Sequence, residues 1–204
     1  MNGIKAVVFD CDGVMFNTDD ANKAYYNSIL SHFKKPDMTL DEFNFAQMHT
    51  ADESIAHLFK ERESFKKAQE YRKKMSYFPF IKDMEMEPYL IPLLKKLRPE
   101  FKTAIATNRS DTMNSVLQEH GLEEYFDIVV SALDVKMPKP HPEPLLKVLK
   151  YFNIGSTQAI YIGDSELDEL SAKKAGVPLV AYNNQSLTAD FHITSLKQIE
   201  NIIM

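Results

Sequence analysis

The sequence is poor in several features that define large classes of proteins. Its 204 residues include a single cysteine, which can form neither an internal disulfide nor a zinc site built from several cysteines. One cysteine also suits a reducing compartment. No apolar run approaches the roughly 20 residues that a membrane-spanning helix requires, and the N-terminal segment MNGIKAVVFD lacks the apolar stretch of a secretory signal. We therefore expect a cytoplasmic protein without a membrane partner.

Positive charge is also scarce. The chain has 24 Lys and Arg residues against 29 Asp and Glu residues, a net charge of −5, so nucleic acid is not an expected partner. With 44% hydrophobic and 26% charged residues, the composition excludes a disordered, collagen-like or fibrous chain. The length allows one ordinary domain or two small ones, and we expect a monomer or a homodimer.

Short apolar segments alternate with longer amphipathic ones over most of the chain. The apolar segments do not alternate with polar residues, as is typical of strands buried on both faces of a parallel sheet. We predict strands at Ala6–Phe9, Thr103–Ala106, Asp127–Ser131, Ala159–Ile162 and Val177–Ala181. We predict helices at Pro88–Leu97, Asp111–His120, Pro142–Tyr151, Glu166–Ala175 and Ser195–Ile203. This alternation predicts an α/β fold with a doubly wound parallel sheet.

The segment from Asn17 to Glu85 has a different pattern, because it contains no glycine and no convincing strand. Its apolar residues recur at helical spacing, which predicts helices at Asp19–Phe33, Thr39–Met48, Asp52–Phe59 and Glu61–Tyr77. We therefore predict that residues 17–85 form a small helical domain inserted into a core made of residues 1–16 and 86–204. Ligands of open α/β sheets bind beyond the carboxyl ends of the strands, so an insertion leaving from there would cover the site.

Two aspartates follow the first predicted strand in the motif FDCDGV. Because side chains alternate along an extended chain, Asp10 and Asp12 face one way and Cys11 faces the other. Two close carboxylates repel each other by about 4 kcal/mol at 4 Å and an effective dielectric near 20, so a cation or a shared proton is expected beside them. Gly13 allows the turn that follows. One carboxylate of such a pair can act as a nucleophile while the other transfers protons.

Polar residues also follow the next predicted strands. Thr107 and Asn108 come directly before a helix N-terminus, where backbone N–H groups favour an anion such as phosphate. Lys139 lies in the proline-rich segment KMPKPHPEP, which is stiff and fixes the direction of the lysine side chain. A lysine held in this way is a candidate for neutralising a phosphate or a carboxylate.

The motif GDSELD places Asp164 after another strand and Asp168 on the first turn of the following helix. Together with Asp10 and Asp12, these residues would bring four negative charges into one crevice, against the single positive charge of Lys139. A phosphate could bind there only beside a divalent cation. Carboxylate oxygens of this kind are suited to Mg²⁺, which keeps several waters and binds phosphate oxygens as well.

The motifs FDCDGV, TNRS, KPHPEP and GDSELDELSAKKAG resemble, in identity and order, those of the haloacid dehalogenase-like (HAD) hydrolase superfamily. The resemblance is to the branch of phosphoglycolate phosphatase-like and β-phosphoglucomutase-like enzymes, and it covers nearly the whole chain. It implies a Rossmann-like core with a helical cap after the first strand. It also implies a hydrolase that releases phosphate from small phosphorylated metabolites.

By that resemblance, Asp10 is the nucleophile that forms an aspartyl-phosphate. Asp12 is the general acid and base, which protonates the leaving group and then activates water. Thr107 and Asn108 hold the transferring phosphoryl group, and Lys139 neutralises this group and Asp10. The implied cofactor is Mg²⁺, with ligands from Asp10, the backbone carbonyl of Asp12, Asp164 and Asp168. In this branch the bond equivalent to Lys139–Pro140 is often cis.

The segment 17–85 resembles the cap of this family in position and length more than in sequence. The specificity loop of the family usually contains glycine and often a cation, whereas the matching stretch here reads MHTADES. We expect His49, Thr50 and Ser54 of this stretch to influence which substrate is chosen. The resemblance leaves the identity of that substrate open.

Three alternatives to a phosphatase share parts of this pattern. A β-phosphoglucomutase-like enzyme has the same core residues, but it holds a bisphosphate with a cap arginine and lysine. The only arginines of the segment 17–85 are Arg62 and Arg72, and both lie in a charged helix. A dehalogenase lacks the second aspartate, so Asp12 argues against one. A non-catalytic phospho-accepting switch also combines aspartates, a threonine and a lysine on a parallel sheet, but without a helical insertion. We rank all three below the phosphatase.

Overall fold

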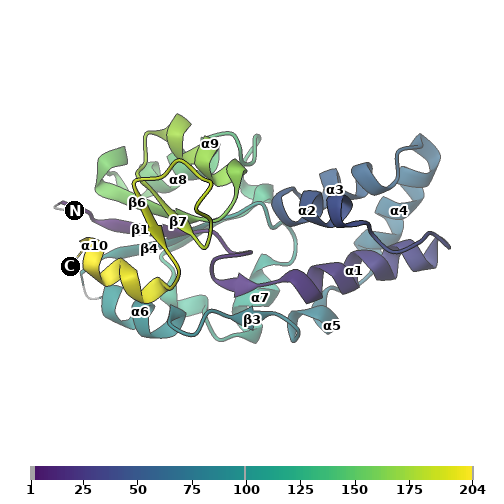
Figure 1. Ribbon diagram of the computed structural model, residues 1–204, viewed down its shortest axis with the longest axis horizontal. Helices are drawn as coiled ribbons and strands as arrows, with labels where there is room; N and C mark the ends of the chain where they lie inside the picture. The colour runs from purple at the N-terminus through teal and green to yellow at the C-terminus, as the bar shows by residue number, and fades with distance from the viewer. Residues whose placement is uncertain (1–2, 99, 204) are drawn as a thin grey trace. The chain divides into compact units, whose positions relative to one another are not determined.

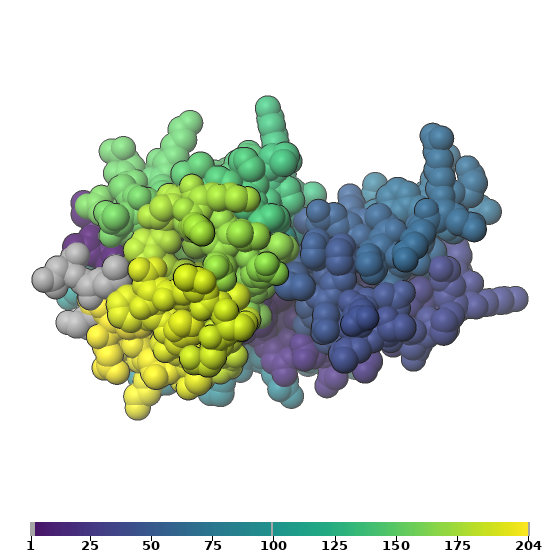
Figure 2. Space-filling view, turned by 45° about the horizontal axis from the view of Figure 1, so that its top comes forward, coloured from purple at the N-terminus to yellow at the C-terminus, as the bar shows by residue number. Residues whose placement is uncertain are grey.

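The computed structural model describes residues 3–98 and 100–203. The chain divides into two compact units, one made of Met1–Asn17 and Met86–Met204 and the other of Thr18–Glu85. In the colour scale of Figure 2 the second unit is blue, and the chain that follows it runs from teal to yellow. Among the described residues, no helix combines the length and the apolar character that crossing a membrane requires.

The first unit is built on a six-stranded sheet with the strand order β5-β4-β1-β6-β7-β8, and every neighbouring pair is parallel. The strands are β1 (Ala6–Phe9), β4 (Lys102–Ala106), β5 (Ile128–Val130), β6 (Ala159–Gly163), β7 (Leu179–Tyr182) and β8 (Phe191–Ile193). The central strand β1 is buried along its whole length, which explains its continuous apolar sequence. The predicted fold class, an α/β protein with a doubly wound parallel sheet, is confirmed.

Helices cover both faces of this sheet, with α8 and α9 on one side and α6 and α10 on the other (Figure 1). Helices of this unit are α6 (Leu90–Leu97), α7 (Met113–Glu119), α8 (Glu143–Phe152), α9 (Glu166–Ala175) and α10 (Glu200–Ile203). Short 3₁₀ segments lie at η1 (Glu123–Tyr125), η2 (Ala132–Asp134), η3 (Ser156–Gln158) and η4 (Leu196–Ile199). Ala6 and Val8 of β1 share one buried apolar cluster with Leu145 and Val148 of α8. This apolar packing fixes the position of β1 relative to α8. The site lies at the carboxyl ends of the strands.

Two features of the C-terminal region differ from the prediction. Strand β8 was not expected, because its three residues include a central exposed histidine, His192, and give too short an apolar signal. The single helix predicted at Ser195–Ile203 is divided into η4 and α10. Helix α9, by contrast, has the predicted bounds, because Ser165 caps its start and Gly176, with a φ of 69°, ends it.

The second unit consists of helices, which are α1 (Asp19–His32), α2 (Leu40–Met48), α3 (Ala51–Leu58), α4 (Arg62–Lys74) and α5 (Phe78–Ile81). Thr39 and Thr50 begin α2 and α3 with reciprocal capping boxes, in which the glutamate three residues later bonds back to the threonine. Buried Ile29, Ile55 and Ile81 contribute to its interior. The chain enters this unit after β2 (Phe16–Asn17) and leaves it at β3 (Glu85–Met86), and these two short strands form a sheet of their own.

Candidate active site

The carboxyl ends of the central strands bring the sequence motifs together. In register, Phe9 of β1 lies beside Ile105 of β4 and Ile162 of β6, and the backbone N–H of Asp10 donates to the carbonyl of Ile162 at 2.9 Å. The side chains that follow these strands therefore meet at one edge of the sheet. This is the position at which ligands bind in open α/β sheets.

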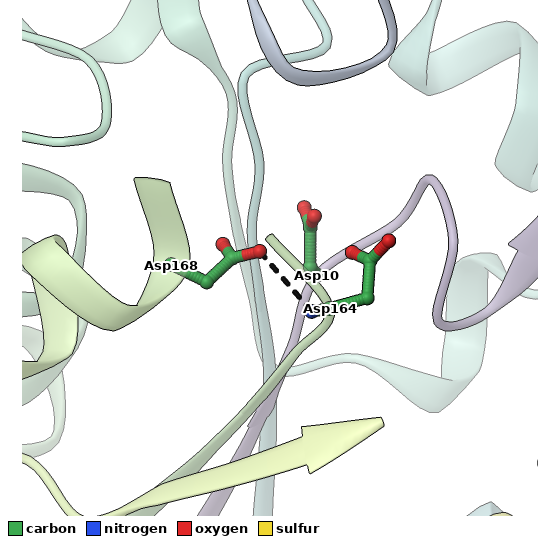
Figure 3. A group of neighbouring side chains, drawn as sticks. All are labelled: Asp10, Asp164 and Asp168. Atoms are coloured by element: carbon green, nitrogen blue, oxygen red, sulfur yellow. Dashed lines mark hydrogen bonds between the residues drawn. The ribbon is translucent and has the colours of Figure 1, made fainter. Parts of the chain in front are cut away.

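Three aspartates form a compact cluster at this edge. Each of Asp10, Asp164 and Asp168 offers a carboxylate oxygen, and these oxygens all lie within 4.8 Å of one another. Figure 3 shows that Asp168 extends from α9 and Asp10 from the end of β1, while Asp164 lies in the segment that joins β6 to α9. The backbone N–H of Asp164 donates to Asp168 Oδ2 at 3.2 Å, the dashed line in the figure.

Gly13 is required by the close approach of Asp164. A Cβ atom at position 13 would lie 2.1 Å from Asp164 Oδ2, and the φ of 79° at this residue disfavours other side chains in any case. The glycine of the FDCDGV motif therefore provides space for a carboxylate as well as a turn. No hydrogen bond to the Asp164 carboxylate occurs within the described ranges, although this side chain is partly buried.

Lys139 is the cation of the cluster, and its side chain is only 2% exposed. Its Nζ atom lies 2.8 Å from Asp10 Oδ1 and 2.7 Å from Asp168 Oδ1, and it donates to the Tyr161 hydroxyl at 3.0 Å. Burial alone would lower the pKa of Lys139, but the two carboxylates outweigh it and raise this pKa above its ordinary value. The ammonium group therefore stays charged between its two anionic neighbours.

Asn108 fixes the backbone from which Lys139 extends. Its side-chain Nδ2 donates to the Lys139 carbonyl at 3.0 Å, and its Oδ1 accepts from the Lys139 N–H at 2.9 Å. The following Lys139–Pro140 bond is cis, as the equivalent bond often is in the family that the sequence resembles. That Asn108 also holds the phosphoryl group stays a prediction.

Asp168 is the most fully bonded of the acidic side chains. Its two carboxylate oxygens accept five hydrogen bonds, from Lys139 Nζ, the Tyr161 hydroxyl, the Asp164 N–H and both the N–H and the hydroxyl of Ser165. Burial would raise its pKa, but Lys139 and these donors outweigh burial and lower it. Gly163 leaves room for Asp168, since a Cβ there would lie 2.4 Å from the Asp168 Cβ. Asp168 is thus held as an anion that anchors Lys139.

Asp10 and Asp164 have the opposite electrostatic character. Burial, with a further contribution from Asp168, raises the pKa of Asp10 from 3.8 to about 7 against the opposing effect of Lys139. Burial and the same neighbour raise the pKa of Asp164 well above its ordinary value. Asp10 Oδ1 accepts no hydrogen bond of good geometry, although it is buried and close to Lys139 Nζ. Both carboxylates would bind a cation favourably, so the residues present fit a divalent metal ion.

Arg109 also belongs to this site, although no role was predicted for it from the sequence. Its Nε donates to Asp12 Oδ2 at 3.1 Å, and its Nη2 forms a short charge-assisted hydrogen bond with Asp12 Oδ1. Arg109 changes the charge balance of the site. The four aspartates of the motifs exceed Lys139 alone by three negative charges, but they exceed Lys139 and Arg109 together by only two. The signal in the sequence was the arginine directly after Thr107 and Asn108, on a loop already assigned to the site.

Tyr161 also belongs to the site, although its place inside the buried apolar strand β6 gives no sign of such a role in the sequence. Its buried hydroxyl donates to Asp168 Oδ1 at 2.6 Å and accepts from Lys139. The predicted Thr107 does lie at the strand ends, where its hydroxyl oxygen accepts from the Arg109 N–H at 3.1 Å. A hydroxyl that accepts one hydrogen bond can still donate its own proton, so Thr107 is suited to donating a hydrogen bond to an anion.

The three residues expected to influence substrate choice lie within the helical unit. Ser54 is fully buried and donates to the Thr50 carbonyl at 3.0 Å, so its hydroxyl is not on a surface that a substrate could reach. The Thr50 hydroxyl is part of the capping box of α3, at 2.7 Å from Glu53 Oε2. His49 is partly buried and stacks on Phe45, with the ring centres 3.7 Å apart. All three residues thus have contacts within the helical unit, and their influence on substrate choice stays a prediction.

Comparison with known proteins assigns the chain to a family. The family model for haloacid dehalogenase-like hydrolases matches residues 7–182. A curated relative, the pyrophosphatase PpaX of Halalkalibacterium halodurans, is 30% identical over 194 residues, which cover 85% of this chain and 81% of the relative. PpaX of Bacillus velezensis is 26% identical over 187 residues, with 85% and 80% covered.

Solved structures agree with this assignment. A HAD-superfamily hydrolase of subfamily IA from Geobacter sulfurreducens is 37% identical, with a TM-score of 0.81 over 98% of this chain and 96% of that one. A β-phosphoglucomutase from Clostridium difficile shares the fold, with a TM-score of 0.85 at 22% identity and 98% and 95% coverage. This chain belongs to the haloacid dehalogenase-like hydrolases.

Proposed function

We propose that this protein is a Mg²⁺-dependent phosphatase that hydrolyses a small phosphorylated metabolite through an aspartyl-phosphate on Asp10. The observation that carries the proposal is the buried carboxylate of Asp10, held 2.8 Å from Lys139 Nζ within a cluster of further aspartates. A carboxylate in this setting can attack phosphorus, because the charge that would repel the phosphate is already offset. The pyrophosphatase relatives support a reaction in which phosphate is released.

In the first half of the reaction, a carboxylate oxygen of Asp10 forms a bond to phosphorus as the bond from phosphorus to the leaving-group oxygen breaks. The protonated Asp12 gives its proton to that oxygen. Thr107 donates a hydrogen bond to the transferring phosphoryl group, and Lys139 offsets its negative charge. Asn108 acts indirectly in this scheme, by holding the backbone of Lys139.

In the second half, Asp12 takes a proton from a water molecule whose oxygen bonds to phosphorus. The bond between phosphorus and Asp10 breaks, which restores the carboxylate and releases inorganic phosphate. Asp12 ends this cycle protonated, ready to act as the acid again. The two halves balance in atoms and protons, and the net reaction consumes one water for each phosphate released.

Magnesium would be held by Asp10, by the backbone carbonyl of Asp12 and by Asp164, with Asp168 contributing through water because its oxygens are already bonded. When bound, the ion supplies positive charge that binds the phosphate oxygens and stabilises the transition state. The protein residues do the rest, since they orient the nucleophile, donate hydrogen bonds and transfer the proton.

We further propose that the helical unit, residues 18–85, is a cap that selects the substrate, with His49 and Thr50 among its contacts. The names of the relatives suggest pyrophosphate as the first substrate to test. The β-phosphoglucomutase-like alternative stays below the phosphatase, because Arg72 is buried in the helical unit and its Nη2 pairs with Asp52 at 2.7 Å. An arginine used in this way is not free to hold a second phosphate.

A panel of pyrophosphate and phosphomonoesters tests the proposal. Purified protein should release inorganic phosphate from at least one of these compounds with Mg²⁺ present, should lose this activity in excess EDTA, and should regain it on addition of Mg²⁺. The Asp10→Asn variant should be inactive and should not form the acyl-phosphate that hydroxylamine traps in the wild type. Retained activity in this variant would overturn the assignment of the nucleophile. Conversion of β-glucose 1-phosphate without net phosphate release would favour the mutase instead.

A further inference from the structure

The Arg109 side chain makes an unusually complete contact with Asp12. Two of its nitrogens, Nε and Nη2, bond separate oxygens of the same carboxylate, which is the two-pronged geometry that only a planar guanidinium provides. The pair is shielded from water, because the arginine side chain is 6% exposed and the aspartate side chain 15%. A pair with this geometry and burial is far more constrained than a surface salt bridge.

The arginine is itself fixed at three further points. Its Nη1 donates to Thr112 Oγ1 at 3.0 Å, its backbone N–H donates to Thr107 Oγ1 at 3.1 Å, and its carbonyl accepts from the Ala132 N–H at 3.0 Å. The guanidinium thus has its orientation set by the loop after β4 and by the start of α7. Asp12, on the turn after β1, takes its orientation from the guanidinium.

We propose that Arg109 is a positioning residue for Asp12: its planar fork orients the Asp12 carboxyl group toward the oxygen of the leaving group. Because the fork stabilises the anion, one of its two hydrogen bonds gives way when Asp12 takes up the proton that it passes on. The inference rests on the proposed function, in which Asp12 is the general acid and base. Arg109 does not contact the reacting phosphorus in this scheme, and its effect passes through the geometry of Asp12. The loss in rate on replacing such a residue should therefore be largest for leaving groups that depend most on protonation by Asp12.

Leaving groups differ in how much they depend on an acid. A strongly basic alkoxide or phenolate departs slowly unless it is protonated, whereas p-nitrophenolate departs readily without a proton. Loss of the acid therefore slows the first step most for basic leaving groups and makes the rate fall more steeply with leaving-group basicity. Damage to the nucleophile or to the phosphoryl-binding residues would instead slow every substrate by the same factor, because the phosphoryl group is common to all of them.

The test is a series of substituted phenyl phosphates, with kcat/KM measured for wild type, Asp12→Asn and Arg109→Gln in saturating Mg²⁺. The parameter kcat/KM reports the steps through the first irreversible one, so it isolates formation of the aspartyl-phosphate. We expect Arg109→Gln to lose roughly 10- to 100-fold on unsubstituted phenyl phosphate and less than about threefold on p-nitrophenyl phosphate. Arg109→Lys, which keeps the charge but loses the planar fork, should fall between the wild type and Arg109→Gln.

The exposed Arg98 at the end of α6 offers a matched control. Arg98→Gln removes the same charge and should leave the whole series unchanged. An equal loss on every phenyl phosphate in Arg109→Gln would overturn the positioning role, and so would an unchanged series. If Arg109→Gln does not fold, by circular dichroism and thermal unfolding, the same two criteria apply to Arg109→Lys.

The two proposals fail in distinguishable ways. If the wild type releases no phosphate from any substrate, or if Asp12→Asn does not steepen the dependence on the leaving group, the general-acid assignment is wrong and the proposed function with it. If Asp12→Asn steepens the dependence but neither arginine variant does, the function stands and only the role of Arg109 is wrong.

Discussion

Replacing the proposed nucleophile should make the metal-free protein more stable. Asp10 has an ordinary pKa of 3.8, and burial raises it to about 7 in the folded protein. A carboxyl group with a raised pKa binds its proton more tightly when folded, so the folded state is penalised as the pH rises from about 4 to about 7. Above pH 7 this penalty is fully present.

The size of the effect follows from the shift. Three pKa units correspond to about 4 kcal/mol, since each unit is 1.36 kcal/mol. Asp10→Asn replaces the carboxylate with a neutral group of nearly the same shape, and Lys139 keeps its contacts with Asp168 and Tyr161. An amide does not reproduce every contact of a protonated carboxyl, so 4 kcal/mol is an upper value and a gain of about 1–3 kcal/mol is expected at pH 8.

Urea denaturation in EDTA, followed by circular dichroism at several pH values between 5 and 8, measures this directly. The gain of Asp10→Asn over wild type should grow with pH and level off above about pH 7. The exposed Asp37→Asn variant is the matched control and should show no such trend. Saturating Mg²⁺ should stabilise the wild type more than Asp10→Asn, because only the wild type offers the Asp10 carboxylate as a ligand. A variant that is less stable than the wild type in EDTA at pH 8, or a difference independent of pH, would refute the reasoning.

Three further outcomes are expected from single substitutions. Gly13→Ala should fold but should bind Mg²⁺ at least about tenfold more weakly by isothermal calorimetry, because the new Cβ would lie 2.1 Å from Asp164 Oδ2 and displace this carboxylate. Unchanged affinity would contradict this close approach. Asn108→Ala should lower kcat by roughly 10- to 100-fold and cost about 1–2 kcal/mol in urea unfolding, because two hydrogen bonds to the Lys139 backbone are lost; full activity would show that the lysine is held by other means. His49→Ala should raise KM for the best substrate at least about threefold with little change in kcat, and an unchanged KM would remove His49 from the substrate contacts.

The sequence was sufficient for the architecture because the central strands carry unambiguous signals. Segments such as Ala6–Phe9 and Ala159–Ile162 are buried on both faces, so their apolar character is continuous. The short edge strand β8 has a polar central residue and gave no such signal. The division of the last helix into η4 and α10 depends on local hydrogen bonding that propensity does not reveal.

For the candidate site, the sequence indicated which residues lie at the strand ends but not which atoms face each other. Asp10, Asp164 and Lys139 could be placed there because strand ends of a parallel sheet share one edge. The pairing of Arg109 with Asp12 depends on a rotamer and on the course of a loop, and neither has a periodic signature. The exchange of hydrogen bonds between Asn108 and the Lys139 backbone is hidden in the same way.

The position of Lys139 links the order of synthesis to catalytic competence. Its ammonium group joins Asp10, near the N-terminus, to Asp168, on a helix that follows the sixth strand of the chain. A nascent chain therefore carries its proposed nucleophile from the start. Lys139 is made only after about two-thirds of the 204 residues have been joined, and Asp168 only after about four-fifths. Contacts over such separations form late, because they require the loops between them to close first. Phosphatase activity in a translation or refolding reaction would therefore report that the sheet is complete, because a fragment that ends before β6 lacks Asp164 and Asp168.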